Sequence, residues 1–452
     1  MSSPVGDTTA HRLLGHLARV QTAGRLPSVT AGVVRDGALA WSGTYGTPAV
    51  PGHDPADVQH RIGSITKTLT AVLVLQLADE GRLDLDAPIR AVLGEVPYAD
   101  RSARQLLAHA SGITAEPAGE WWERSAGVSF EELLARHAAA PAVTSPGSRF
   151  HYSNLGYALL GEVVARLRGR PWADCVAERV LAPLGMTRTS YLPTGPAAQG
   201  WSVDPYTREL VPEPATDTRA MAPAGQLWST VADLATYAAF LVEGHPGVLD
   251  ASWLEVAAVP QAGSAGDALA AAQGLGLQLL RGGSGTLVGH GGSMPGFLAA
   301  CFTDRPRRTA AVVLAPATTG FSPTDLARAL LEELEACEPA LPRPWRPTDV
   351  VPAALDGVLG TWHWGNTPLV LALTGGPGGG EVVATGPGGA EKWRFAVVDG
   401  RIVGTGGYHH GEELHVVRRA DGSISHLEVA TFVLTRTPYD PDAPAPGGHP
   451  GR

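Results

Sequence analysis

The chain has 452 residues, a formal net charge of −10 and 44% hydrophobic residues. Its length allows two or three domains, and its hydrophobic fraction suffices for a large core. The negative charge disfavours nucleic acid and anionic membranes as partners. Cys175, Cys301 and Cys337 are odd in number and widely spaced, which predicts neither a disulfide framework nor a zinc site.

The predicted elements begin with a helix over residues 13–20 and a hairpin of strands 29–34 and 39–44 around an Asp36-Gly37 turn. A mostly helical region then runs from residue 64 to about residue 242. Strand patterns return at 275–280, 286–288, 297–302 and 310–314, before a closing amphipathic helix at 324–337. Strands at both ends with helices between them predict an α+β fold, in which distant segments complete one antiparallel sheet.

The C-terminal part has a different composition. The first domain is predicted to end at residue 337, and residues 338–352 form a proline-rich linker of stiff, extended preference. Residues 353–437 alternate short strands with glycine-rich turns, which predicts a small antiparallel β-barrel. The tail 438–452 is predicted to be disordered.

Two features of this C-terminal part resemble binding sites only superficially. His409, His410, Glu412, Glu413 and His415 crowd one turn and could bind a metal, but they follow no standard ligand spacing. A solvated hairpin tip is therefore favoured, and no metal is expected. The glycine run 375–380 lacks both the order G-x-G-x-x-G and a following helix, so no nucleotide cofactor is expected.

The first 30 residues contain no apolar stretch of signal-peptide length. No later run of about 20 apolar residues could span a bilayer. The sequence therefore predicts a cytoplasmic protein with no membrane partner, acting on a substrate made inside the cell.

Lysine occurs only twice among 34 basic residues, at Lys67 and Lys392. An arginine stays protonated, whereas a buried lysine can lose its proton and activate a hydroxyl, so Lys67 is a candidate base. It follows Ser64 by three positions, which places both on one face of a predicted helix. A serine in the first turn also lies near free backbone N–H groups that stabilise negative charge. Alone, the pair is a weak motif, because a serine cap followed by a lysine also arises by chance.

Two further motifs follow in the chain, although each alone is more often structural. Tyr152-Ser153-Asn154 precedes a helical run, and a phenol can relay a proton while an amide can hold a carbonyl group. The second motif is His290-Gly291-Gly292-Ser293. Its first residue is the last residue of a predicted edge strand, 285–290. There Gly291 and Gly292 would let a substrate backbone approach closely.

Together, these motifs resemble the S-x-x-K, Y-x-N and H-x-G elements of the active-site serine family of penicillin-binding proteins and class C β-lactamases. Segments 106–113 and 225–234 look like further parts of that family, and the resemblance covers about residues 8–337. It implies the β-lactamase/transpeptidase-like fold, an antiparallel sheet domain beside an all-helical one, with the serine in the cleft between them. The C-terminal barrel looks like the lipocalin-like domain that follows some members.

The resemblance also implies a role for each residue. Lys67 would take the proton of Ser64, which attacks a carbonyl group, and Tyr152 would share that proton traffic. Asn154 would orient Lys67 and the substrate amide. The backbone N–H groups of Ser64 and Ser293 would form the oxyanion hole.

His290 departs from the lysine of those members that recognise a carboxylate. A neutral imidazole gives a free carboxylate no firm anchor, so esters, thioesters and neutral amides are the expected substrates. Histidine here resembles the esterases, the D-aminopeptidases and, most closely, the stand-alone penicillin-binding-protein-type thioesterases that release nonribosomal peptides as macrocycles. This resemblance implies a peptidyl thioester or ester with a C-terminal D-residue, delivered by a carrier protein. The alternatives are a D-amino-acid-specific peptidase or carboxylesterase, with water as acceptor, and a non-catalytic acyl-binding module.

Overall fold

The computed structural model describes residues 4–138, 141–263, 270–283, 285–341, 344–345, 347, 350–374 and 380–440. The chain forms two compact units, Met1–Ala340 and Leu341–Arg452. Residues 375–379 of the glycine run, and residues 441–452 of the tail predicted to be disordered, lie outside the described residues.

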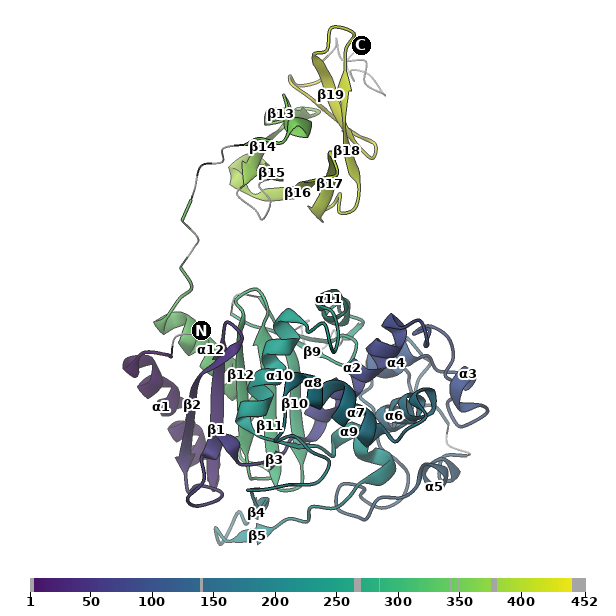
Figure 1. Ribbon diagram of the computed structural model, residues 1–452, viewed down its shortest axis with the longest axis vertical. Coiled ribbons are helices and arrows are strands. Elements are labelled where there is room, and N and C mark those ends of the chain that lie inside the picture. Colours follow the sequence, from purple (N-terminus) through teal and green to yellow (C-terminus); the bar gives the residue numbers. More distant parts are fainter. Residues whose placement is uncertain are drawn as a thin grey trace. The chain divides into compact units, whose positions relative to one another are not determined.

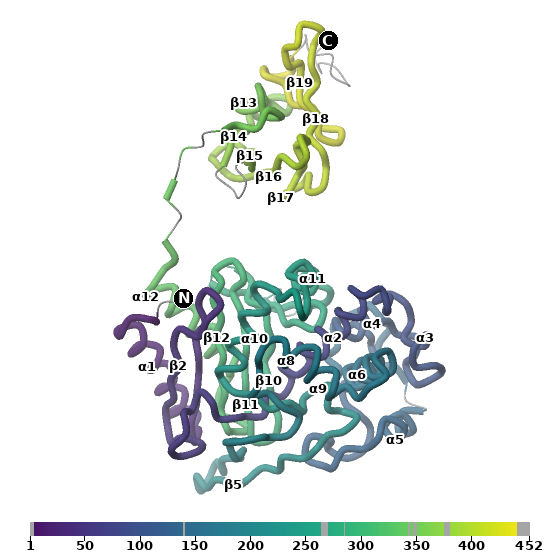
Figure 2. The backbone as a smooth tube through the Cα atoms, in the orientation of Figure 1, coloured from purple at the N-terminus to yellow at the C-terminus, as the bar shows by residue number. Residues whose placement is uncertain are grey.

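The sheet of the first unit consists of β1 (Ser28–Arg35), β2 (Ala38–Gly46), β7 (Ala262–Gly263), β8 (Ala271–Gln273), β9 (Gln278–Arg281), β10 (Thr286–Met294), β11 (Phe297–Asp304) and β12 (Thr309–Ala315). Its order is β2-β1-β12-β11-β10-β9-β8-β7, and each neighbouring pair is antiparallel. The N-terminal hairpin joins the late strands because β1 pairs with β12, with Thr30 opposite Leu314. Figure 2 shows the purple and green segments side by side. The predicted sheet made of distant segments is confirmed.

The helices of the first unit are α1 (Asp7–Gly24), α2 (Thr66–Asp79), α3 (Arg90–Leu93), α4 (Ala103–Leu107), α5 (Phe130–Ala135), α6 (Asn154–Arg168), α7 (Trp172–Val176), α8 (Ala182–Leu184), α9 (Ala222–Gly225), α10 (Val231–Glu243), α11 (Ala251–Ala257) and α12 (Pro323–Cys337). Short strand pairs interrupt the predicted helical region, namely β3 (His60–Arg61) with β6 (Trp228–Ser229) and β4 (Trp201–Val203) with β5 (Leu210–Pro212). Within the described residues, every helix is too short or too polar to traverse a lipid bilayer.

Helices cover both faces of the sheet (Figure 1). On one face, α1 and α12 bury apolar residues at helical spacing, including Leu13 with Leu17 and Leu326 with Leu330, against β1, β11 and β12. On the other face, α10 buries Val231 and Leu234 in a larger core that continues into the helical part of the unit. The sheet is therefore the middle layer between two hydrophobic cores.

The central element of the helical part is α2, which contacts α6, α7 and α9. Every residue from Thr66 to Leu77 is buried, so this part of the helix has no solvent-exposed face and lies inside the unit. It is preceded by a 3₁₀ turn, Gly63–Ile65, and Ser64 belongs to that turn rather than to the α-helix itself. The turn therefore holds Ser64 at the N-terminal end of a helix that packing fixes on all sides.

The second unit is a closed barrel of β13 (Gly360–Trp364), β14 (Thr367–Thr374), β15 (Glu381–Thr385), β16 (Glu391–Val398), β17 (Arg401–Gly407), β18 (Glu413–Arg418), β19 (Ile424–Val429) and β20 (Phe432–Thr435). Consecutive strands are neighbours, and β20 closes the barrel on β13. This up-and-down arrangement is the one that lipocalins use. Buried side chains such as Trp362, Phe395 and Leu427 form its core. The predicted antiparallel barrel is confirmed.

The predicted solvated hairpin tip is wrong for His409. Its side chain is fully buried, its Nδ1 lies 2.6 Å from Glu412 Oε2, and its ring packs edge-on against Trp393 and Phe432. His410 and His415 are exposed and lie outside this contact. Aromatic packing therefore draws one histidine of the cluster into the barrel. Among the described residues, no group of three or more His, Cys, Asp or Glu side chains is placed to hold a metal ion.

The close approach of β10 and β11 gives a test of this fold. A β-carbon on Gly289 would lie 2.0 Å from the carbonyl oxygen of Cys301, so Gly289→Ala should force the strands apart. We expect a loss of about 1–3 kcal/mol in the free energy of unfolding, measured as a lower Tm by circular dichroism. Gly285→Ala is the matched control, because nothing lies within 4 Å of its β-carbon position. Equal Tm values for the two variants would contradict this packing.

Candidate active site

Ser64 and Lys67 are in direct contact. Lys67 lies in the first turn of α2 and is fully buried, whereas Ser64 is half-buried. The lysine Nζ donates one hydrogen bond to Ser64 Oγ, at 2.9 Å, and another to the carbonyl oxygen of Ala224 in α9, at 2.7 Å. The spacing predicted from the sequence therefore places the amine beside the hydroxyl, and the hydrogen bond to α9 fixes the position of the amine.

Burial lowers the pKa of the Lys67 amine from 10.5 to about 7. The carboxylates of Glu116 and Glu123 act in the opposite direction, because a nearby negative charge favours the protonated amine. A pKa near 7 leaves a large fraction of the amine unprotonated at neutral pH. Lys67 can then accept the proton of Ser64, which an arginine at this position could not do.

Tyr152 lies next to this pair. Its ring centroid is 5.0 Å from Lys67 Nζ, and its ring stacks on that of His109 at 4.1 Å. Burial raises the pKa of the Tyr152 phenol, and a hydrogen bond to Ser64 acts in the opposite direction. Tyr152 is therefore a neutral phenol in contact with Ser64, able to donate or accept a hydrogen bond.

His109 lies outside the three sequence motifs. It is buried in a left-handed conformation with φ of +53°, and its Nδ1 accepts the backbone N–H of Ser153 at 3.0 Å. Burial, together with the positive charge of Lys67, lowers its pKa well below the usual value. The neutral ring thus supports Tyr152 and holds the backbone beside it. Its sequence signal was the family-like segment 106–113, in which it lies.

Asn154 makes a different contact from the one expected. Its Nδ2 donates to Glu116 Oε1 at 2.7 Å, and the indole N–H of Trp122 donates to Glu116 Oε2 at 2.7 Å. The hydrogen bonds of Lys67 go instead to Ser64 and Ala224. Asn154 thus lies close to the pair but is fixed by a carboxylate from the loop before Trp122. Neither Glu116 nor this loop carries a periodic pattern that would have revealed the contact.

The predicted edge position of residues 285–290 is wrong for most of that segment. β10 is an interior strand, paired with β11 from Leu287 to Met294 and with β9 up to Gly289, because β9, β8 and β7 extend the sheet beyond it. The ladder with β9 ends at Gly289, which lies opposite Gln278. The His290 motif therefore begins where β9 stops.

His290 is a buried, neutral imidazole. Its Nδ1 bonds the carbonyl oxygen of Gly291, and its Nε2 is buried with no hydrogen-bond partner among the described residues. Burial and the nearby Lys67 lower its pKa to about 3. A neutral ring that donates from Nδ1 leaves Nε2 as an acceptor. The motif therefore supplies a hydrogen-bond acceptor and no positive charge.

The glycines of this motif are explained by packing inside the chain. A β-carbon on Gly292 would lie 2.0 Å from the carbonyl oxygen of Ile62, and one on Gly63 would lie 2.6 Å from the Ser293 nitrogen. At Gly291, the nearest atom would be Thr324 Oγ1, at 3.0 Å. The backbones of β10 and the serine turn therefore touch, which brings the Ser293 amide close to the turn that carries Ser64.

A family model described as Beta-lactamase matches residues 14–336. The chain belongs to the beta-lactamase family. This confirms the family predicted from the three motifs. A second model, described as Domain of unknown function (DUF7586), matches residues 351–436, which contain the barrel.

Among the relatives, "Beta-lactamase-like protein 2" of Dictyostelium discoideum is 30% identical over 52% of this chain and 46% of its own length. "Esterase EstB" of Burkholderia gladioli is 34% identical over 38% of this chain and 49% of its own length. The chain thus spans about half the length of these curated relatives.

Three solved structures extend the comparison. The D-stereospecific amidohydrolase of a Streptomyces species has a TM-score of 0.62 and 27% identity, covering 73% of this chain and 98% of its own. The octameric penicillin-binding protein homologue of Pyrococcus abyssi has a TM-score of 0.64 and 21% identity, covering 95% and 100%. The structure of SurE has a TM-score of 0.59 and 24% identity, covering 95% and 99%. At these identities, the last two show a shared fold alone.

The pKa of Lys67 predicts how activity depends on pH. If the free amine is the base, kcat/KM for a neutral ester should rise with pH to a plateau, with a midpoint near 7. His290 should not contribute above pH 5, because its pKa is about 3. Initial rates between pH 5 and 9, corrected with Ser64→Ala enzyme, would measure this. A flat profile, or a rate that falls through pH 7, would contradict the assignment of Lys67 as the base.

Proposed function

We propose that this chain is a serine acyl-transfer enzyme in which Ser64 is the nucleophile and Lys67 the base. The observation that carries the proposal is the 2.9 Å contact between Ser64 Oγ and a buried amine whose pKa is near 7. A hydroxyl is a weak nucleophile until an adjacent base takes its proton. Both groups are in place, which disfavours the non-catalytic acyl-binding alternative.

In the first half-reaction, the Ser64 oxygen bonds to the substrate carbonyl carbon while its proton passes to Lys67. The resulting oxyanion accepts hydrogen bonds from the backbone N–H groups of Ser64 and Ser293. When the tetrahedral intermediate collapses, the bond to the leaving group breaks, and that group takes the proton from Lys67 directly or through the Tyr152 phenol. The product is an acyl-enzyme on Ser64.

In the second half-reaction, the acceptor is an amine or a water molecule. Lys67 takes a proton from it as it attacks the acyl carbonyl, and Ser64 leaves with that proton restored. An amine acceptor gives a new amide, whereas water gives an acid. The substrate that occupies the cleft, rather than the Ser64–Lys67 pair, then decides between acyl transfer and hydrolysis.

The charges of the site favour a neutral acyl donor. His290 is neutral, and Glu116 and Glu123 both lie close enough to act on the Lys67 amine. A free substrate carboxylate would meet these negative charges, and the neutral His290 of the third motif would offer it no positive charge. Esters, thioesters and amides are therefore the substrate class that we propose.

Within this class, we propose a thioesterase that releases a nonribosomal peptide with a C-terminal D-residue, by attack of the peptide's own amino terminus. His290 in the third motif and the barrel after the catalytic unit support this choice, through the resemblance to the stand-alone thioesterases. The alternative is a D-amino-acid-specific peptidase or carboxylesterase with water as acceptor. The Burkholderia esterase and the Streptomyces D-stereospecific amidohydrolase favour that alternative.

Mass spectrometry of the products tests the acyl-enzyme. We expect a linear peptide thioester ending in a D-residue to give a cyclic product with wild-type enzyme, and none with Ser64→Ala. Removal of the exposed Ser252 hydroxyl in α11, as Ser252→Ala, is the matched control and should leave product formation unchanged. Linear acid as sole product would move the assignment to the hydrolytic alternative. Turnover retained by Ser64→Ala would contradict the nucleophile itself.

Removal of residues 341–452 tests the barrel. If that unit handles a carrier protein, its loss should lower kcat/KM about tenfold or more for a carrier-bound thioester, while a small soluble thioester with the same acyl group loses much less. The soluble substrate is the internal control for folding of the remaining unit, which is compact by itself. Equal losses for both substrates would contradict a carrier-binding role.

A further inference from the structure

A cavity in the helical part of the first unit lies outside the proposed catalytic residues. Its volume is about 270 Å³, nearly twice the roughly 150 Å³ that holds a benzene molecule in an engineered protein cavity. Residues of α6, α7 and α9 line it. The helix α6 contacts both of the others, and Figure 1 shows the three together. Pro171 and Arg219 on the border of the cavity are exposed, so the cavity opens to solvent.

This cavity is separate from the Ser64 site, although α6 extends from one to the other. At the start of α6, Asn154 belongs to the tyrosine motif. The residues of α6 that line the cavity share one helix face and are Ala158, Gly161, Glu162 and Ala165. At 1.5 Å per residue, they lie about 6–17 Å along the helix axis from Asn154. The acyl-transfer steps therefore leave this cavity unused.

The helix α9 forms a second wall, and its other side holds the catalytic lysine. A β-carbon on Gly161 would lie 2.1 Å from the Pro223 ring, so the glycine lets α9 pack directly on α6. Pro223 lines the cavity, while its carbonyl oxygen accepts a hydrogen bond from Thr70 Oγ1 at 2.9 Å. The next carbonyl oxygen, that of Ala224, accepts the bond from Lys67. A ligand in the cavity would therefore rest on a helix that α2 already fixes.

Most of the cavity wall is apolar and held by packing. Phe130 and Trp172 are buried in the core of the unit, as is Pro223. The small side chains of Ala158 and Ala222 leave the space between these larger groups. An aliphatic or aromatic group of a ligand would lose contact with water against this wall, which is favourable.

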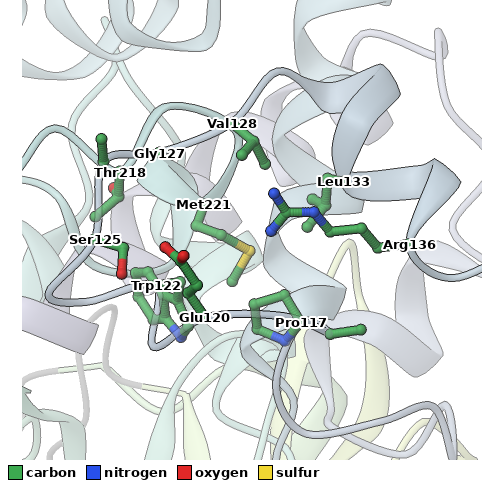
Figure 3. A pocket seen from close by; sticks show the side chains of 12 residues that line it. Pro117, Glu120, Trp122, Ser125, Gly127, Val128, Leu133, Arg136, Thr218 and Met221 are labelled. Atoms are coloured by element: carbon green, nitrogen blue, oxygen red, sulfur yellow. The ribbon is translucent and has the colours of Figure 1, made fainter.

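One border of the cavity is the 3₁₀ turn Arg219–Met221, which lies between two cavities. Figure 3 shows the smaller one, of about 40 Å³, which Thr218 and Met221 line beside Trp122. Arg219 instead lines the larger one, and its φ is +46°. Residues other than glycine adopt this left-handed conformation uncommonly, and ligand clamps are among the places where they keep it.

Two opposite charges belong to the larger cavity. Arg219 presents a planar guanidinium, which suits a carboxylate. Glu162 lies on α6, where its Oε1 pairs with Arg166 at 2.8 Å. A partly exposed ion pair of this kind contributes little, and a carboxylate has about four lone-pair positions. Glu162 is therefore an oriented anion that can accept a second cation.

We propose that this cavity is a binding site for a free amino acid with an apolar side chain. Arg219 binds the α-carboxylate, Glu162 binds the α-ammonium group, and the apolar wall receives the side chain. A free amino acid carries both charges on one carbon, which matches a cavity with one cation and one anion at its border. Incorporation into the interior of a peptide removes both charges, so the site selects free amino acids.

Calorimetric titration of the full-length Ser64→Ala protein with phenylalanine, each enantiomer separately, tests the inference. This variant removes turnover by the proposed nucleophile, and the binding itself does not depend on the acyl-transfer mechanism. At least one enantiomer should bind with a Kd of about 1 mM or lower. Phenylalanine amide lacks the carboxylate and 3-phenylpropionate lacks the ammonium group, so both should bind about tenfold more weakly or worse. Equal binding of the three compounds, or no binding of either enantiomer at about 10 mM, overturns the inference.

Variants of the cavity locate the bound phenylalanine. Arg219→Gln and Glu162→Gln should each raise its Kd about tenfold, because each removes one charge-assisted contact. Ala165→Phe should abolish binding, because it places a ring in the cavity. Circular dichroism verifies the fold of each variant, and the two charge variants decide the outcome if Ala165→Phe does not fold. An unchanged Kd in the folded variants would place the ligand elsewhere and overturn the inference.

Two matched controls separate this site from general charge effects. Arg208→Gln removes another exposed arginine in a left-handed conformation, with φ of +68°, and should leave the Kd unchanged. Arg166→Gln removes the partner of Glu162 but keeps its carboxylate, so phenylalanine should bind at least as tightly as before. A rise of the Kd in Arg208→Gln equal to that in Arg219→Gln would show a diffuse charge effect and would contradict the site.

Discussion

The active site depends on the burial of one amine. Lys67 is enclosed by α2, α6 and α9, and its hydrogen-bond partners are a hydroxyl and a backbone carbonyl rather than a carboxylate. The shift of its pKa from 10.5 to about 7 corresponds to about 5 kcal/mol in favour of the neutral amine. A contacting carboxylate would restore the usual lysine charge and remove the base. Glu116 and Glu123 act less strongly than the burial, so the pKa remains near neutrality.

The same burial sets the protonation of the neighbouring groups. His109 and His290 are neutral because charging them would cost desolvation energy and would bring positive charge near Lys67. Tyr152 remains a neutral phenol because burial also disfavours the negatively charged phenolate. The Ser64–Lys67 pair therefore lies among groups that can exchange hydrogen bonds without carrying charge, whereas Glu116 and Glu123 act on Lys67 as negative charges.

Local sequence was sufficient where one short segment determines the geometry. Lys67 lies in the first turn of α2 and Ser64, three residues earlier, in the 3₁₀ turn that leads into it. Ser153 caps α6 beside Tyr152, so these positions follow from local spacing. The sheet of distant segments and the barrel also followed from strand patterns and their order. What remained hidden depends on contacts between separate segments. The partner of Asn154 is a loop carboxylate, and no periodicity marks Glu116.

Non-local pairing also explains the errors in strand placement and in the reading of the third motif. The strand that carries His290 is predicted to be an edge because the pattern of residues 275–280 predicts a strand but not its neighbour, and because β7 and β8 are too short to show a pattern. The sequence predicts that Gly292 lets a substrate backbone approach closely. In the structure, the backbone oxygen of Ile62, 230 positions earlier in the chain, occupies the space that a side chain at Gly292 would need. His409 lies in the turn between β17 and β18, so the alternating pattern of the strands does not predict its burial. The rings that pack against it, Trp393 and Phe432, come from other strands. Each error concerns which segment lies across from a residue, and a single sequence does not record that information.

The pairing of β1 with β12 has a consequence for biosynthesis. β1 is an interior strand of the finished sheet, but its second partner is the last strand of that sheet to be made. At roughly 5–20 residues per second, the ribosome needs on the order of 15–50 s to add the intervening segment. During that time, the hydrophobic edge of β1 has no native strand to pair with and is open to the strands of neighbouring nascent chains. Cellular yield of this protein should therefore depend on chaperones that cover an early hairpin, and on spacing between ribosomes, more than on the stability of the finished fold.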